Sequence, residues 1–143
     1  MVRRIYIDGI FDLFHKGHVL HLKKIKELDN QENQVIVGII SDQDAINYKR
    51  KPIYDEEHRK ILIESCKYVD EVIMCVPLII NESFLEKHNI DLVCHAFINK
   101  EDEEKQSAFY KIPMKLNKFR TIDYYSPIST SFLLNEIRSN KNN

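Results

Sequence analysis

Two apolar segments near the start of the chain are separated by one amphipathic segment. Ile5–Ile7 is short, β-branched and aromatic and ends at Asp8-Gly9, and Val35–Ile40 is apolar on both faces, as in buried parallel strands. Between them, Val19–Leu28 carries apolar side chains at near-helical spacing, with lysines on its other side. Strand, helix and strand within about 35 residues predict a βαβ unit with a right-handed crossover.

The same alternation continues toward the C-terminus. Asp55 is suited to cap a helix that reaches Cys66, and a strand follows at Glu71–Met74. The charged segment Asn99–Gln106 is expected to be a surface loop. Other patterns predict a short helix over Ser83–His88, a strand over Leu92–Cys94, a partly helical segment over Ser107–Leu116 that Pro113 interrupts, and a last helix that begins at Ser129–Ser131. The whole predicts an α/β fold, a three-layer sandwich with a central parallel sheet, in one domain over residues 1–143.

The charge balance and the cysteines exclude several classes of protein. The 143 residues carry 21 Lys and Arg against 22 Asp and Glu, so the basic surface that nucleic-acid binding normally needs is not expected. Cys66, Cys75 and Cys94 are widely separated and form no C-x-x-C pair, which favours reduced thiols over a disulfide or zinc site. No signal-peptide pattern and no apolar stretch of about 20 residues is found, so we expect a cytoplasmic or nuclear protein with no membrane segment.

The segment that follows the first predicted strand is the main candidate for a functional site. It contains His15 and His18, three residues apart, with Gly17 directly before the second histidine. Ligands of open parallel sheets bind beyond the carboxyl ends of the strands, and a helix N-terminus there attracts phosphate. Imidazoles at that position can donate hydrogen bonds to phosphate oxygens, although either histidine alone would more often be structural.

A second candidate phosphate-binding segment lies near the C-terminus, at Ile128-Ser129-Thr130-Ser131. Any one of these hydroxyl groups can be an ordinary helix N-cap. Three hydroxyl-bearing residues in a row provide more donors than one cap requires, so a ligand-binding role is the alternative.

Several motifs occur in the order found in one enzyme family. The segments Asp8-Gly9-Ile10-Phe11-Asp12 and His15-Lys16-Gly17-His18 resemble the signature of the cytidylyltransferases that activate phosphocholine, phosphoethanolamine and glycerol 3-phosphate. The resemblance extends from about Arg4 to Arg138. Further matches are Ile36-Val37-Gly38 with Ser41-Asp42, Glu57-His58-Arg59, Tyr68 to Val72, Asn89-Ile90-Asp91 and Ile128 to Ser131.

The resemblance implies a Rossmann-like fold of the HxGH nucleotidyltransferase type and a reaction of CTP with a phosphoalcohol, which gives a CDP-alcohol and pyrophosphate. Mg²⁺ would enter with CTP, and no residue of the chain is expected to be a metal ligand. The catalytic residues implied are His15, His18 and Lys49. The nucleotide-binding residues implied are Ile7, Asp8, Gly9, Phe11, Asp12, His15, His18, Arg59, Ile128, Ser129, Thr130 and Ser131, and the substrate-binding residues are Asp12, Lys49, His95, Lys100 and Tyr110.

The resemblance also implies a homodimer, with contacts through Tyr68–Glu71. Without the resemblance, Lys49 would be interpreted as a solvated lysine, Arg59 as a helix-surface residue and Tyr68–Glu71 as the polar end of a helix.

Two departures from the family pattern concern the substrates. Tyr124 stands where the family has an arginine that binds the triphosphate, and Arg120, four residues earlier, is a possible replacement. Ala96 and Lys100 stand where a choline site would have an acid and an aromatic residue. We therefore expect phosphocholine to be a poor substrate, and an anionic or neutral polyol phosphate to suit Lys100 better.

Two alternatives to an active cytidylyltransferase stay open from the sequence. Loss of the late arginine and of the substrate acid favours a weakened nucleotide-binding pseudoenzyme or dimerisation module, whereas the two histidines disfavour it. Adenylyl transfer within the same superfamily is the other alternative, because backbone contacts that the sequence does not specify select the base.

Overall fold

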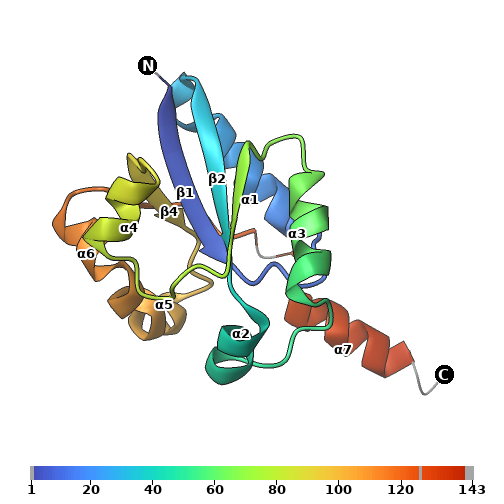
Figure 1. Ribbon diagram of the computed structural model, residues 1–143. Helices are drawn as coiled ribbons and strands as arrows, with labels where there is room; N and C mark the ends of the chain where they lie inside the picture. Colours follow the sequence, from blue (N-terminus) through green and yellow to red (C-terminus); the bar gives the residue numbers. More distant parts are fainter. Residues whose placement is uncertain (1, 126, 141–143) are drawn as a thin grey trace.

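The computed structural model describes residues 2–125 and 127–140. Strand β1 (Arg3–Gly9), helix α1 (Lys16–Lys26) and strand β2 (Asn33–Ile39) form the predicted βαβ unit (Figure 1). β1 and β2 pair in parallel, with Ile5 opposite Val35. A short 3₁₀ helix, η1 (Leu28–Asn30), connects α1 to β2.

The central sheet has five parallel strands in the order β3-β2-β1-β4-β5. The other three strands are β3 (Glu71–Met74), β4 (Leu92–His95) and β5 (Phe119–Thr121), of which β5 was not predicted. The chain builds outward from β1 in one direction and then returns to add β4 on the other side. The strand order therefore reverses between β1 and β4, which is the position where open parallel sheets bind ligands.

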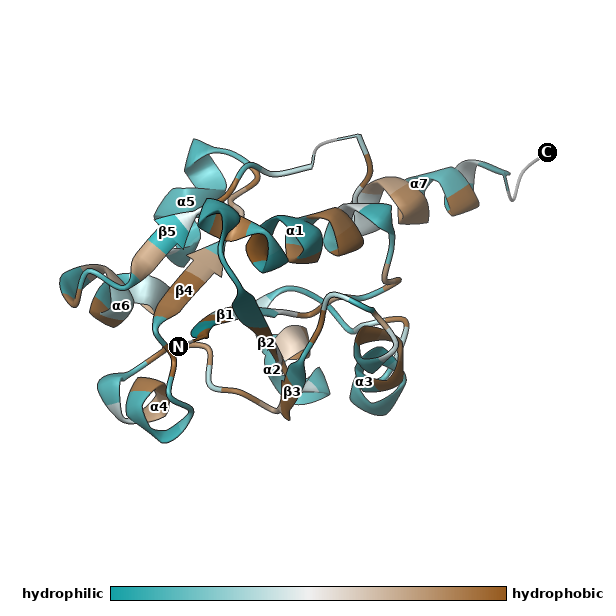
Figure 2. Cartoon of the chain, turned by 90° about the horizontal axis from the view of Figure 1, so that it is seen from above, coloured by the Kyte–Doolittle hydropathy of each residue, from teal (hydrophilic) through white to brown (hydrophobic). Residues whose placement is uncertain are grey.

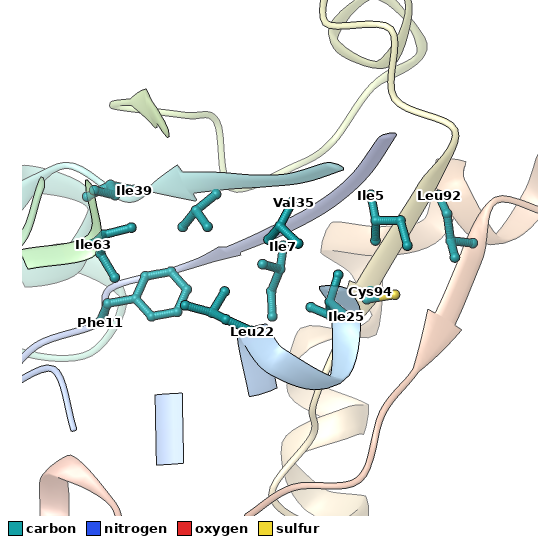
Figure 3. Close-up of a cluster of buried hydrophobic side chains, with 11 residues drawn as sticks. Ile5, Ile7, Phe11, Leu22, Ile25, Val35, Ile39, Ile63, Leu92 and Cys94 are labelled. Atoms are coloured by element: carbon teal, nitrogen blue, oxygen red, sulfur yellow. The ribbon is translucent and has the colours of Figure 1, made fainter. Parts of the chain in front are cut away.

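Successive residues of the central strands pack on opposite faces of the sheet. On one face, Ile5 and Val35 contact a cluster that includes Leu22 and Ile25 of α1 and Ile63 of α3 (Glu56–Glu64), as Figure 3 shows. On the other face, a cluster forms around Tyr6, Ile36, Val93, Leu85 of α4 (Glu82–Lys87) and Tyr110. This arrangement confirms the three-layer α/β sandwich, and the brown and teal residues of α1 in Figure 2 show its amphipathic character.

Two helices were not predicted, and one predicted loop was wrong. Asn99–Gln106 is largely helical: α5 (Lys100–Gln106) begins after Asn99, whose side chain accepts a hydrogen bond from the Asp102 N–H. α2 (Asp42–Tyr48) begins in the same way after Ser41. Both are short and polar, so neither has the apolar periodicity from which the other helices were predicted.

The C-terminal part consists of a 3₁₀ turn, η2 (Ser107–Tyr110), followed by α6 (Lys111–Lys115) and, after β5, α7 (Thr130–Asn140). Pro113 was expected to interrupt a helix, but it lies inside the first turn of α6. A missing N–H costs little in a first turn, so the helix continues past Pro113. α7 extends away from the sheet in Figure 2. In the described part of the chain, every helix is too short or too polar to cross a bilayer.

Candidate active site

A cavity of about 700 Å³ opens at the carboxyl ends of β1 and β4. Its walls come from the loop after β1, the start of α1, the segment after α2, the loop after β4, the α5–η2 region and residues 124, 125 and 128–131. Segments that are far apart in the chain therefore meet at the reversal of strand order.

Most of the predicted site residues lie in the wall of this cavity. Lys49, His95 and Tyr110 line it, whereas Arg59 and Lys100 do not. The predicted nucleotide-binding residues in the wall are Ile7, Asp8, Gly9, Phe11, Asp12, His15, His18, Ile128, Ser129, Thr130 and Ser131.

His15 and His18 form a stacked pair at the start of α1, with ring centroids 3.9 Å apart. Nδ1 of His15 accepts a hydrogen bond from the Gly17 N–H at 3.0 Å, and Nδ1 of His18 accepts one from the His15 N–H at 3.2 Å. When both Nδ1 atoms are acceptors, a neutral imidazole carries its proton on Nε2. Local backbone geometry thus fixes both rings as Nε2–H donors.

Burial keeps both histidines neutral. It lowers the pKa of His15, and, together with the charge of neighbouring groups, it lowers the pKa of His18 to about 3. The glycine between them is also required, because a Cβ atom at Gly17 would lie 2.8 Å from Cε1 of His15. A larger residue there would displace the His15 ring from the cavity wall.

Asp12 connects three parts of the cavity wall. Its carboxylate accepts hydrogen bonds from the N–H groups of Ile53 and Tyr54 at 2.8 and 2.9 Å, and its carbonyl accepts one from Oγ1 of Thr130 at 2.7 Å. Ser129 Oγ accepts a hydrogen bond from the Phe132 N–H, as an N-cap does. The hydroxyl groups of Ser129 and Thr130 therefore have structural partners inside the protein, and both residues line the cavity.

Arg59, predicted to bind nucleotide, lies behind the cavity wall rather than in it. Its side chain is fully buried and donates hydrogen bonds to the carbonyls of Ile10, Ile40 and Tyr54 at 2.7, 2.9 and 3.1 Å. Nη2 also pairs with Asp42 at 2.7 Å. Arg59 thus holds together the segments that follow β1, β2 and α2.

A hydrogen-bonded chain crosses from β1 to β4 in the wall of the cavity. The hydroxyl group of Tyr110 donates to Asp8 at 2.7 Å and also contacts Nδ1 of His95 at 2.9 Å. Burial raises the pKa of Asp8 to about 6, against the opposing effect of the Tyr110 hydrogen bond, and burial lowers the pKa of His95 to about 4. The hydroxyl group of Tyr110 therefore fixes the orientation of the Asp8 and His95 side chains.

Tyr124 and Tyr125 both line the cavity, although neither was predicted to be a site residue. The Tyr125 N–H donates to Nε2 of His21 at 2.9 Å, and the Tyr124 ring lies 5.4 Å from the His21 ring. Asp102 of α5 also lines the cavity. Two adjacent aromatic residues before the Ser129–Ser131 segment were the available signal.

Arg120 does not replace the missing arginine. It binds Asp29 through Nη1 at 2.9 and 2.8 Å, and Asp29 also pairs with Arg3. These hydrogen bonds lower the pKa of Asp29 and keep Arg120 outside the cavity wall.

Lys49 follows α2 and supplies positive charge to the cavity wall. Burial, and then the nearby charge of Arg50, lowers the pKa of Lys49. Among the residues that the structure describes, no three His, Cys, Asp or Glu side chains are grouped so that they could hold a metal ion.

We expect the protein to lose stability as the pH falls below 6.5. Burial lowers the pKa values of His18, His21 and His95 to about 3, 4 and 4, so the unfolded chain binds more protons than the native protein. Asp8 has the opposite effect on stability, because its pKa is raised to about 6 and it binds one proton in the native protein that the unfolded chain does not bind at these pH values. The free energy of unfolding should fall by about 3 kcal/mol between pH 6.5 and 5.

Urea unfolding at these two pH values tests this expectation. A midpoint that does not change with pH would mean that the three imidazoles are not buried as neutral groups. In the variant Asp8→Asn the opposing group is absent, so stability should fall more steeply over the same interval.

The fold and the cavity together define a Rossmann-like α/β domain with a ligand site at the switch point of its sheet. Residues 6–141 match the family described as Cytidylyltransferase-like. The chain belongs to this family.

Named relatives agree with this assignment. The chain is 34% identical over 143 residues to an ethanolamine-phosphate cytidylyltransferase of Arabidopsis thaliana. This match covers 96% of the present chain and 33% of the relative. It is 35% identical over 134 residues to choline-phosphate cytidylyltransferase A of Homo sapiens, covering 94% of this chain and 36% of the relative. The chain thus spans about a third of the length of these curated relatives.

Among solved structures, a lipopolysaccharide core biosynthesis protein from Thermoplasma volcanium GSS1 has the same fold, with a TM-score of 0.67 and 28% sequence identity. The superposition covers 88% of this chain and 100% of that chain.

Proposed function

We propose that the protein transfers CMP from CTP to a phosphorylated small alcohol, which gives a CDP-alcohol and pyrophosphate. The observation that carries this proposal is the pair of neutral histidines, His15 and His18, whose Nε2–H tautomers are fixed by backbone N–H groups in the cavity wall. The names of the relatives support CTP as the nucleotide and a phosphoalcohol as the acceptor.

In the proposed reaction, an oxygen of the acceptor phosphate attacks the α-phosphorus of CTP. The bond from that phosphorus to the oxygen bridging to the β-phosphate breaks, and its electron pair leaves with pyrophosphate. The phosphate oxygens gain charge in the transition state, and the two Nε2–H groups donate hydrogen bonds to them. No covalent intermediate on the protein is needed, because positioning and charge stabilisation suffice.

Mg²⁺ is proposed to enter with CTP and to neutralise part of the triphosphate charge. Mg²⁺ commonly keeps few protein ligands and binds through the phosphate oxygens of its substrate.

For the acceptor we propose a phosphorylated amino alcohol. Of the two residues that disfavour a cationic substrate, Ala96 lines the cavity, whereas Lys100 is exposed and lies outside the cavity wall. Asp102 lines the cavity instead. Asp102 lies near Tyr48, another wall residue, whose pKa is raised by burial and then by the charges of Asp102 and Asp8. A carboxylate there favours an ammonium group over an anionic polyol phosphate.

The test is pyrophosphate release with each of CTP and ATP, Mg²⁺, and phosphoethanolamine, phosphocholine or glycerol 3-phosphate, with the product identified by mass spectrometry. We expect CTP and the two amino-alcohol phosphates to react. Turnover with ATP alone would identify an adenylyl-transferring member, and CTP binding without turnover would identify a pseudoenzyme. Preference for glycerol 3-phosphate would refute the role given to Asp102.

Lys49→Ala should raise KM for both substrates and lower kcat by roughly tenfold or more, because a cation of the cavity wall that would contact phosphate is lost. Steady-state kinetics with each substrate varied in turn measures this. Lys51→Ala is the matched control, since Lys51 is exposed and outside the cavity wall. Equal activity of the two variants would assign Lys49 to the solvated surface.

We also propose a homodimer with contacts through Tyr68–Glu71. Within the chain, Asp70 accepts hydrogen bonds from Lys26 and Val35, both at 2.7 Å, and Glu71 pairs with Arg4 at 3.3 Å. Light scattering at micromolar concentration should give twice the mass of one chain, and the mass of a single chain would refute the proposal.

A further inference from the structure

The segment after α2 brings a second cationic residue to the cavity, beside Lys49. Arg50 lines the cavity wall, and its Nε atom is buried with no hydrogen-bond partner in the part of the chain that the structure describes. A buried guanidinium N–H without an acceptor is costly, and such groups normally contact an anion or a carbonyl oxygen. Arg50 is therefore suited to bind an anionic ligand in this cavity.

The other cationic side chains near the site have partners or lie in solvent. Arg120 is bound to Asp29 by two hydrogen bonds. Lys105 lines the cavity but is 70% exposed and pairs with Glu101 at 3.3 Å. Both histidines of the pair are neutral, so they contribute donors rather than full charges.

A nucleoside triphosphate brings several negative charges into the same cavity. The resemblance places the uncharged Tyr124 where the family pattern has an arginine for these charges, and Lys49 provides one point charge. A planar guanidinium can donate two parallel hydrogen bonds to phosphate oxygens, which an ammonium group cannot reproduce.

We propose that Arg50 binds the β- and γ-phosphates of the nucleotide and performs the role of the arginine that Tyr124 replaces. This inference rests on the proposed function, because it takes the nucleotide to be CTP. It makes Arg50 a substrate-binding residue whose contribution depends on the length of the phosphate chain.

Calorimetric titration with CTP and with CMP tests this assignment in the intact protein. Arg50→Gln should weaken CTP binding by roughly tenfold or more and CMP binding by less than about twofold, because CMP lacks the two distal phosphates. Arg50→Lys, which keeps the charge but not the planar fork, should give an intermediate loss of CTP affinity. Lys51→Gln removes an exposed neighbouring charge and should leave both affinities within about twofold.

Equal CTP affinity of Arg50→Gln and the unmodified protein would overturn the assignment and leave the proposed function intact. An equal loss of CTP and CMP affinity would also overturn it, since Arg50 would then act on the α-phosphate or on the fold. Thermal melts of each variant identify a loss that comes from unfolding. Failure of the unmodified protein to bind CTP would refute both proposals.

Discussion

Replacing His18 by Ala should lower kcat for CMP transfer by a hundredfold or more. The His18 ring is neutral and presents Nε2–H in the cavity wall, and one donor directed at developing phosphate charge is worth roughly 2.7–4 kcal/mol. Because the contact strengthens as charge develops, the loss should appear in kcat more than in KM. Pyrophosphate release at saturating concentrations of both substrates measures it.

His15 needs a different design, because its side chain also caps α1. His15→Ala would remove both the cap and the catalytic donor, whereas His15→Asn keeps a good capping residue. We expect both variants to lose activity to a similar extent and only His15→Ala to lose stability. His58→Ala is the control for a histidine outside the cavity, since His58 is exposed and stacks on Tyr54. Near-normal turnover of both His15→Asn and His18→Ala would refute the mechanism.

The central sheet could be predicted because its signals are local. Each long apolar run became a strand, and β1 and β2 pair over their full length. The position of the cavity followed from the same pattern, since parallel strands joined by helices must present their carboxyl ends at one edge. His15 and His18 therefore lie where the order of elements requires them, directly after β1.

Features that depend on long-range contacts could not be predicted. The partners of Arg59 lie 49, 19 and 17 residues away, at Ile10, Ile40 and Asp42, so its helical position carried no sign of full burial. β5 contributes only three residues to the sheet edge. α5 has no apolar face, so apolar periodicity does not indicate a helix there. Asn99, a residue that favours the N-cap position, was the remaining sequence signal for this helix. The error at α5 affected the substrate prediction, because Lys100 and Asp102 differ in whether they reach the cavity.

Arg59→Met should reduce the free energy of unfolding by about 3–5 kcal/mol, because several buried acceptors lose the donor that they share and each unsatisfied group costs about 1–3 kcal/mol. The substitution would leave Asp42 without its buried cation and would leave the Ile10 and Ile40 carbonyls without the donor that they share. Urea unfolding at pH 7 measures the change. Lys60→Met on the same helix removes an exposed pair with Glu64 and should change stability by less than about 0.5 kcal/mol.

The same variants distinguish a positioning role of Arg59 from direct contact with nucleotide. If Arg59 only holds the segments after β1, β2 and α2, loss of CTP affinity should accompany loss of stability, because the cavity wall moves when its support is removed. If Arg59 bound nucleotide directly, Arg59→Met would weaken CTP binding while stability changed as little as in Lys60→Met. The four hydrogen bonds that Arg59 makes inside the protein favour the first result.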